Sequence, residues 1–288
     1  MRWWRRCAAR VVLASLTVVL GGLLSASLAR YAPGYGSDER LLDARLSHES
    51  VEAIRQESAQ QGSILSYYSQ AMEKMLRLDF GASRTLHRPV RALLAERGVV
   101  TLRLVAAGLS TGWIAALALV LATWLVDNFA LDMTSLVGSG ALLCLPAGAV
   151  SLLLVLADGP AYLALALVVF PKTYRYLRNL ARMAERMPHI MTARAQGTSA
   201  ARTLLYHIVP IIRGELLALA GVSVSIAIGA AIPVEALSGT PGLGQLAWQA
   251  ALGRDLPVLL AVSAVVIACT VVANSGADLL ADQRSLTP

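Results

Sequence analysis

Long apolar runs constrain this chain more than any other feature of its sequence. Each run has about 20 residues, the length that an α-helix needs to cross the hydrocarbon core of a bilayer. Charged residues make up 15% of the 288 residues and hydrophobic residues 56%, whereas a soluble domain carries roughly 25% charged residues. The sequence therefore predicts an all-α, polytopic membrane protein with six transmembrane helices. The six runs lie at 11–29, 99–126, 132–157, 159–178, 210–237 and 256–280.

The first run follows the basic segment MRWWRRCAAR, an order that also occurs in secretory signal peptides. Small residues at Ser25-Ala26-Ser27 would suit a cleavage site, but the run is longer than the 7–15 residues of a signal-peptide core. Trp3 and Trp4 are typical of anchors at a membrane interface. We therefore expect residues 1–31 to form a cytoplasmic N-terminus and an uncleaved first helix.

Residues 32–98 are far more polar, with nine basic and nine acidic side chains. Ser47 and Ser63 can cap two short amphipathic helices, and the segment LDFGAS ends this region at Ser83. We expect a small helical domain outside the bilayer, followed by a five-helix core over 99–288.

Basic residues cluster beside the apolar runs, and their placement predicts the topology. Four arginines lie in the first ten residues, and eight lysines and arginines lie in 172–213. Both regions fall on the same side of a six-span chain, so that side and both termini are predicted to be cytoplasmic. The net charge of +7 is explained in this way without a nucleic-acid partner. Cys7, Cys144 and Cys269 have no spacing that predicts a disulfide framework or a metal site.

A polar, glycine-punctuated stretch, TARAQGTSAARTLLYHIVP, separates the fourth and fifth runs. Its residues predict a helix–turn–helix: Pro188 suits a first helical turn, and Gly197 suits the left-handed position that ends a helix. Ser199 can cap the second helix, which joins the fifth run at Pro210. On the cytoplasmic side the apolar residues Ile190, Met191 and Ala193 have no lipid to face, so we expect them to need a protein partner.

This stretch resembles the cytoplasmic coupling loop, or EAA motif, of ABC importer permeases. TARAQG at 192–197 is similar to the T-A-R-A-K-G of the dipeptide/oligopeptide/nickel permease family, with Gln196 for the usual lysine. Pro188 stands where an acidic residue is common. Three further segments resemble the family in order and spacing. They are LDFGAS at 78–83, PVEALSGTPGLGQLAWQAALGRDLPV at 233–258, and the ending with Asn274, Asp278 and ADQR at 281–284.

The resemblance implies a type I, MetI-like permease core and an inner-membrane location. It implies a coupling loop at 179–209 whose residues 188–209 dock an ATPase. The expected partners are two ABC ATPase subunits, a second permease subunit, an extracytoplasmic binding protein and membrane lipid. ATP and Mg²⁺ would be bound by the ATPases, with no cofactor in this chain, and the solute would be a peptide or a related small molecule. The implied ATPase contacts are Ile190, Met191, Thr192, Ala193, Arg194, Ala195, Gln196, Gly197 and Thr198.

A second candidate site lies near the outer end of the fifth run, at Glu235, Pro241, Gly242 and Gly244. The P-G-L-G sequence lacks the spacing and the Lys-Ser/Thr of a nucleotide-binding loop, so we expect a tight re-entrant turn that forms an external gate. Glu235 could contact a substrate, although a hydrogen bond at the helix end is the simpler interpretation.

Two other classes of membrane protein are weaker alternatives. A rhomboid-like protease needs a serine or paired acids with a base inside the bundle, and no such group is spaced for it here. A secondary transporter working without ATPase partners favours an inverted repeat and intramembrane ionisable residues, neither of which the sequence displays.

The arginine distribution makes the topology testable. A cysteine introduced at Ser58 should react with a membrane-impermeant thiol reagent in intact cells, because residues 32–98 are predicted to be external. The unsubstituted chain supplies the background labelling. Labelling of this cysteine only after the membrane is broken would contradict the six-span topology.

Overall fold

The computed structural model describes scattered residues between 12 and 27, residue 73, residues 79–126 and residues 128–282. The helices predicted after Ser47 and Ser63 lie outside the described residues, apart from residue 73. The regular structure of the described part is helical, and an isolated bridge joins Ala82 to Pro89. The all-α prediction is confirmed for this part.

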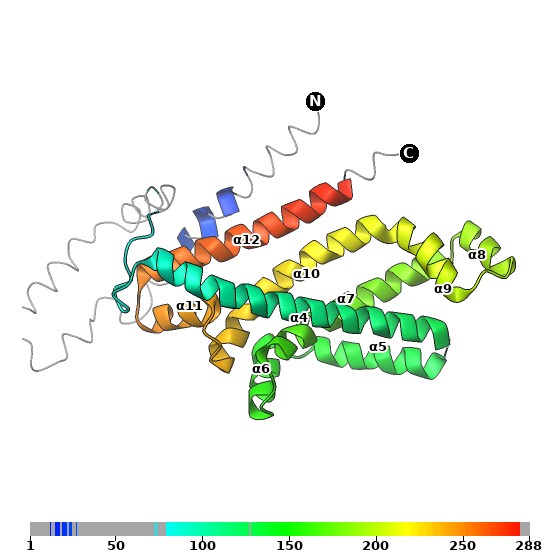
Figure 1. Ribbon diagram of the computed structural model, residues 1–288, viewed down its shortest axis with the longest axis horizontal. Coiled ribbons are helices and arrows are strands. Elements are labelled where there is room, and N and C mark those ends of the chain that lie inside the picture. The colour runs from blue at the N-terminus through cyan, green and yellow to red at the C-terminus, as the bar shows by residue number, and fades with distance from the viewer. Residues whose placement is uncertain are drawn as a thin grey trace, which may run out of the picture. The chain divides into compact units, whose positions relative to one another are not determined.

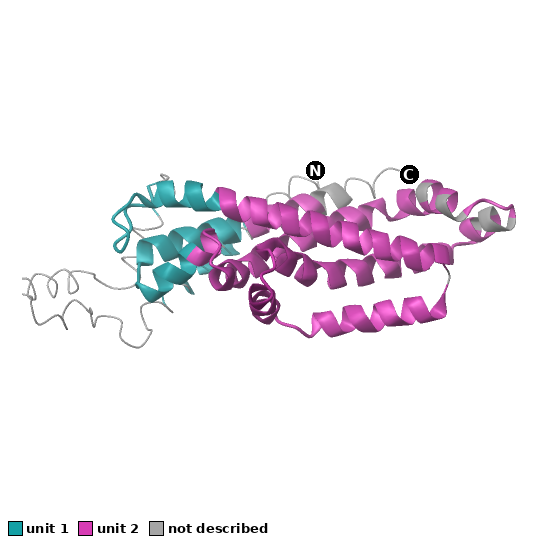
Figure 2. Cartoon of the chain, turned by 60° about the horizontal axis from the view of Figure 1, so that its bottom comes forward, with its two compact units in different colours: residues 1–98, 246–268 teal, residues 99–245, 269–288 magenta. Residues whose placement is uncertain are grey.

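The chain forms two compact units, which Figure 2 colours separately. Residues 246–268, which the sequence placed in the five-helix core, group with the N-terminal part of the chain. The units are Met1–Gly98 with Leu246–Ala268 (unit 1) and Val99–Gln245 with Cys269–Pro288 (unit 2).

Three helical stretches of the described part are long and apolar enough to cross a membrane. They correspond to the second, fifth and sixth predicted runs, although α4 begins nine residues earlier than the run at 99. The stretches are Val90–Val126 (α4), Tyr206–Ser238, which ends in α10 (Val209–Ser238), and Leu256–Ala277 within α12 (Leu256–Asp282).

The third predicted run, 132–157, does not form one continuous helix, and that expectation is wrong. It is divided into α5 (Phe129–Leu143) and α6 (Ala147–Leu156), which meet at an angle of 99°. Pro146 directly precedes α6, has no N–H to donate and disfavours a helical conformation at Leu145. The α5–α6 pair therefore has the geometry of a broken span or of a re-entrant loop.

The fourth predicted run, 159–178, lies in a longer helix, α7 (Ala161–Glu185). From residue 172 onward this helix carries four basic residues and extends beyond the apolar part. It is therefore not among the helices that are long and apolar enough to cross a membrane. These residues are Lys172, Arg175, Arg178 and Arg182. Ten residues of α7 are buried, which makes it the central helix of unit 2.

Close backbone approach holds the helices of unit 2 together (Figure 1). A Cβ atom added to Gly108 of α4 would lie 2.7 Å from the Cβ atom of Leu165 on α7. One added to Gly221 of α10 would lie 2.1 Å from the Cβ atom of Ala277 on α12. Glycine at these positions therefore allows the neighbouring backbones to touch, as is common between helices in membranes.

A buried carboxylate organises unit 1. Asp255 is fully buried, directly precedes α12, and accepts hydrogen bonds from the Ser83 hydroxyl at 2.6 Å and the Thr85 hydroxyl at 2.9 Å. It also accepts bonds from the backbone N–H of Thr85 at 3.1 Å and, at the start of α12, of Val258 at 3.4 Å. The LDFGAS segment at 78–83 and the RDLP sequence at 254–257, which are distant in sequence, thus meet at the side chain of Asp255.

Asp255→Ala should lower the free energy of unfolding by about 2–3 kcal/mol, because it removes a helix cap and leaves buried donors unpaired. Thermal unfolding of the full chain in detergent measures this. Glu96→Ala is the matched control, since Glu96 forms an exposed ion pair with Arg88 at 3.0 Å and should cost less than about 1 kcal/mol. Equal losses for the two variants would refute the central role of Asp255.

Candidate functional site

Residues 188–209, which we call the coupling segment after the role expected from the sequence, form the helix–turn–helix that the sequence predicts. Helix α8 (Pro188–Ala195) begins at Pro188, and Gly197 follows it with a φ of 81°, in the left-handed region that favours glycine. Helix α9 (Ala200–Thr203) comes directly after Ser199, whose carbonyl oxygen accepts the N–H of Thr203 at 2.9 Å. Figure 1 shows α8 and α9 between the end of α7 and the start of α10.

Ile190 anchors this segment from within, and the expectation that it needs a protein partner is wrong. Its side chain is fully buried in one cluster with Ala184 of α7, Ile208, which directly precedes α10, and Ile212 of α10. The sequence could not distinguish an apolar residue that packs inside the chain from one that waits for another protein. The packing fixes α8 to the two helices that flank the segment.

The remaining coupling residues lie on the outer part of the segment. Met191 is 61% exposed, and Thr192, Gln196 and Gly197 are also exposed, whereas Thr198 is half-buried. The side chains of Ala193, Arg194 and Ala195 lie outside the described part of the structure. An exposed surface of this kind, held on a packed anchor, is suited to contact another protein.

One feature of the segment was missed by the sequence analysis. A π-helical turn, η2 (Leu204–Ile208), joins α9 to α10 and presents Tyr206 with 72% of its surface exposed. Such turns frequently occur at functional sites. The hydrophobic spacing alone does not signal a π-turn, because one wide turn leaves the pattern of the flanking helices intact.

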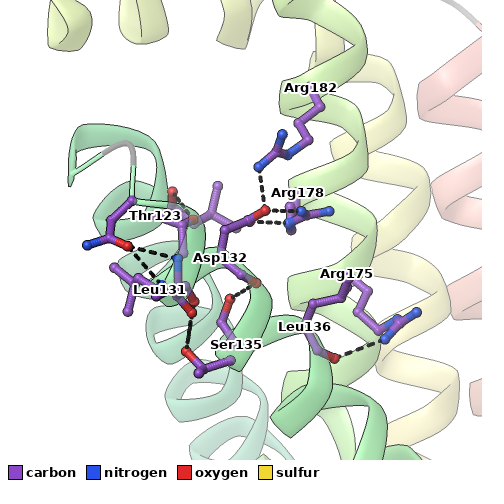
Figure 3. A network of polar contacts seen from close by, with 12 residues as sticks. Thr123, Leu131, Asp132, Ser135, Leu136, Arg175, Arg178 and Arg182 are labelled. Carbon is purple, nitrogen blue, oxygen red and sulfur yellow. Dashed lines mark hydrogen bonds and ion pairs between the residues drawn. The ribbon is translucent and has the colours of Figure 1, made fainter.

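An acidic residue at the start of α5 holds α7, and it was also missed (Figure 3). One oxygen of Asp132 accepts a hydrogen bond from Nε of Arg178 at 2.7 Å, and the other accepts one from Nη2 of Arg178 at 2.5 Å. Arg182 adds a third bond at 2.7 Å. The side chains of Asp132 and Arg178 are each only 14% exposed. The signal in the sequence was a single acidic residue at the start of the apolar run 132–157, together with arginines at the end of the next run, 159–178.

Two neighbouring contacts continue this seam between α5 and α7. The hydroxyls of Ser135 and Tyr174 share a hydrogen bond at 2.6 Å. Nη1 of Arg175 donates to the backbone carbonyl of Leu136 at 3.3 Å. Nearer the coupling segment, Nε1 of Trp124 on α4 donates to the Glu185 carboxylate at the end of α7.

A groove of about 590 Å³ adjoins the same helices. Its lining is mostly apolar and comes from α4, α5, the turn after α5, and α7. The lining residues are Leu119, Ser135, Gly138, Ser139, Ala141, Leu142, Leu145 and Phe170.

At the other candidate site Glu235 makes the helix-end hydrogen bond that the sequence favoured. It is fully buried, and its Oε2 accepts the N–H of Gly244 at 2.6 Å in the first turn of α11 (Leu243–Leu252). Thr101 of α4 hydrogen-bonds to the same carboxylate, and its hydroxyl accepts the N–H of Leu243 at 2.8 Å. The Glu235 side chain is therefore engaged in joining α4, α10 and α11 rather than open to a solute.

The P-G-L-G turn is tight, as predicted, because its glycines press against α10. A Cβ atom at Gly242 would lie 2.3 Å from the carboxyl carbon of Glu235. One at Gly244 would lie 2.5 Å from Cα of Ile232. A side chain at Gly244 would have to move the backbone of α11 or α10, and one at Gly242 would have to displace the Glu235 carboxylate, which explains the two glycines after Pro241.

Residues 108–284, from α4 to α12, match the family described as "Binding-protein-dependent transport system inner membrane component". The chain belongs to this family. The match covers more than half of the sequence and includes both the coupling segment and the Glu235 turn. The chain is therefore an inner-membrane component of a transport system.

Several bacterial proteins are similar to this chain. A peptide permease protein of Brucella suis biovar 1 is 30% identical over 105 residues, 36% of this chain and 33% of the relative. The oligopeptide transport system permease protein AppB of Bacillus subtilis is 32% identical over 106 residues, 37% and 34% of the two chains. These alignments span about a third of each relative's length. A peptide transport system permease protein of Brucella suis biovar 1 is 28% identical over 282 residues, 86% and 85% of the two chains.

Gly242→Ala should separate α11 from α10, because the new methyl group must displace the Glu235 carboxylate. We expect a loss of about 1–3 kcal/mol in the free energy of unfolding, as for other overpacked sites. Gly229→Ala in α10 is the control, since a Cβ atom there meets nothing within 4 Å and alanine favours a helix. If both variants unfold at the wild-type temperature, the turn does not depend on Glu235.

Proposed function

We propose that this chain is the permease subunit of an ABC importer for peptides or a related small solute. Its role would be to form half of the translocation pathway and to receive motion from an ATPase through residues 188–209. The observation that carries the proposal is the coupling segment, which combines the exposed residues Met191, Thr192, Gln196 and Gly197 with the buried anchor Ile190. Family membership supports this function over a secondary transporter or a membrane protease.

Peptides are the solute class that the relatives favour. The three relatives described above are named as peptide or oligopeptide permeases, and one of them aligns with 86% of this chain. The selection of one solute would lie mainly in a separate extracytoplasmic binding protein.

The proposed assembly has a second permease subunit, two ABC ATPases and the binding protein. ATP and Mg²⁺ would be bound by the ATPases, and this chain would hold no cofactor. We infer six spans with both termini cytoplasmic, in which the run at 11–29, the α5–α6 pair and α7 join the three apolar helices. The arginines of 172–213 support this orientation.

The anchoring of α8 suggests how motion reaches the spans. Closure of the ATPases on ATP would displace the docked α8. Because Ile190 packs against both Ala184 at the end of α7 and Ile212 in α10, this displacement would pull two spans at once. Packed interfaces of this kind switch between discrete arrangements rather than deform continuously.

Gly197→Val tests the proposal. A β-branched residue in the left-handed conformation costs on the order of 1–2 kcal/mol locally, and the turn would open or shift. A Cβ atom at Gly197 meets nothing within 4 Å, so the spans should remain intact and membrane levels normal. Transport and co-purification of the ATPases should fall sharply for Gly197→Val and less for Gly197→Ala.

Arg213→Ala is the matched control, because Arg213 is an exposed basic residue just beyond the segment. All variants are compared at equal membrane levels. Normal transport by Gly197→Val together with a loss in Arg213→Ala would show that the coupling surface lies elsewhere.

A further inference from the structure

The attachment of α5 to α7 depends on one carboxylate in the first turn of α5. Asn128 caps this helix by accepting the N–H of Ala130 at 2.8 Å, and Asp132 follows within the same turn. A negative charge is favoured at a helix N-terminus. The Arg178 fork meets both oxygens of Asp132, a geometry that fixes direction as well as distance.

Farther along α5, small side chains offer little that could interlock with a neighbouring helix. Gly138, Ser139, Gly140 and Ala141 succeed one another over a full turn. Such surfaces permit close approach between helices but do not fix the register of one helix along another. The Asp132 contacts with Arg178 and Arg182 therefore provide the charged, directional hold between α5 and α7 in the described part of the chain (Figure 3), beside the neutral hydrogen bond of Ser135 and the backbone contact of Arg175.

Helix α7 connects this hold to the coupling segment. It runs without a break from Ala161 to Glu185, and Arg182 lies one turn before its end. Ala184 in that last turn packs against Ile190 of α8. A displacement of α8 is thus passed to the part of α7 that follows the internal Pro171, and this part carries both arginines.

We propose that Asp132 is a positioning residue for transport, which makes α5 move with α7 when the coupling segment is displaced. The moving element then carries one wall of the 590 Å³ groove, since Ser135, Gly138 and Leu142 on α5 line it. This inference rests on the proposed function, because it assumes that the coupling segment receives motion from an ATPase.

The test uses the whole importer in proteoliposomes, with its ATPases and binding protein, and measures solute transported per ATP hydrolysed. Asp132→Asn should leave ATP hydrolysis within about twofold of wild type and lower transport by about tenfold, so that the two activities uncouple. Asp132→Glu, which keeps the charge, should recover most of the transport. Arg178→Lys should give an intermediate loss, because lysine cannot form the two-pronged contact.

Lys172→Ala is the matched control on α7, since Lys172 is an exposed basic residue and no hydrogen bond or ion pair joins it to the described residues of α5. Its transport per ATP should stay at the wild-type value. Unchanged coupling in Asp132→Asn would overturn the proposal.

The double variant Asp132→Leu with Arg178→Met separates a positioning role from a structural one. It removes both charges of the largely buried pair, so neither is left without its partner. We expect it to assemble and hydrolyse ATP while transport stays low. Restored transport, or failure of both this variant and Asp132→Asn to assemble, would mean that the pair only stabilises the fold. A wild-type chain that does not bind ATPases would instead refute the proposed function.

Discussion

The cost of removing a carboxylate from water governs how the described part of this chain is held together. Buried acids are tolerated in an apolar environment only where donors compensate them. Three acids accept hydrogen bonds at helix N-termini: Asp132 in the first turn of α5, Asp255 before α12, and Glu235 on the first turn of α11. Asp255 and Glu235 accept N–H groups from the helix start, whereas Asp132 accepts from Arg178 and Arg182 of α7. Each of these carboxylates also joins its helix to another segment.

Close contact between backbones supplies the rest of the packing. Helices gain no hydrophobic free energy by leaving lipid for one another, so they depend on dispersion contacts at short range. Gly108 on α4 and Gly221 on α10 provide this proximity. The polar hydrogen bonds then determine which of several possible close-packed arrangements the helices adopt.

The sequence predicted the helical class, three of the apolar helices, the turn at Gly197 and the helix-end role of Glu235. Each of these depends on local chemistry, such as run length, the conformational freedom of glycine, or a short separation along the chain. The bend at Pro146, the burial of Ile190 and the contact between Ser83 and Asp255 were not predicted. The proline is a local signal for the bend, which the run length masked. The other two depend on which distant segments pack together, and hydrophobic periodicity in a single sequence does not contain that information.

The π-turn at Leu204–Ile208 has a consequence for the rotational phase of the coupling segment. Successive residues of an α-helix are separated by about 100° around its axis, and a π-turn accommodates an additional residue within an otherwise regular helix. Removing one residue there would rotate α9 and α8 by roughly a quarter turn relative to α10. Because Ile190 of α8 packs in one buried cluster with Ile208 and Ile212, such a rotation would break this packing, so the π-turn and the buried anchor must agree in rotational phase.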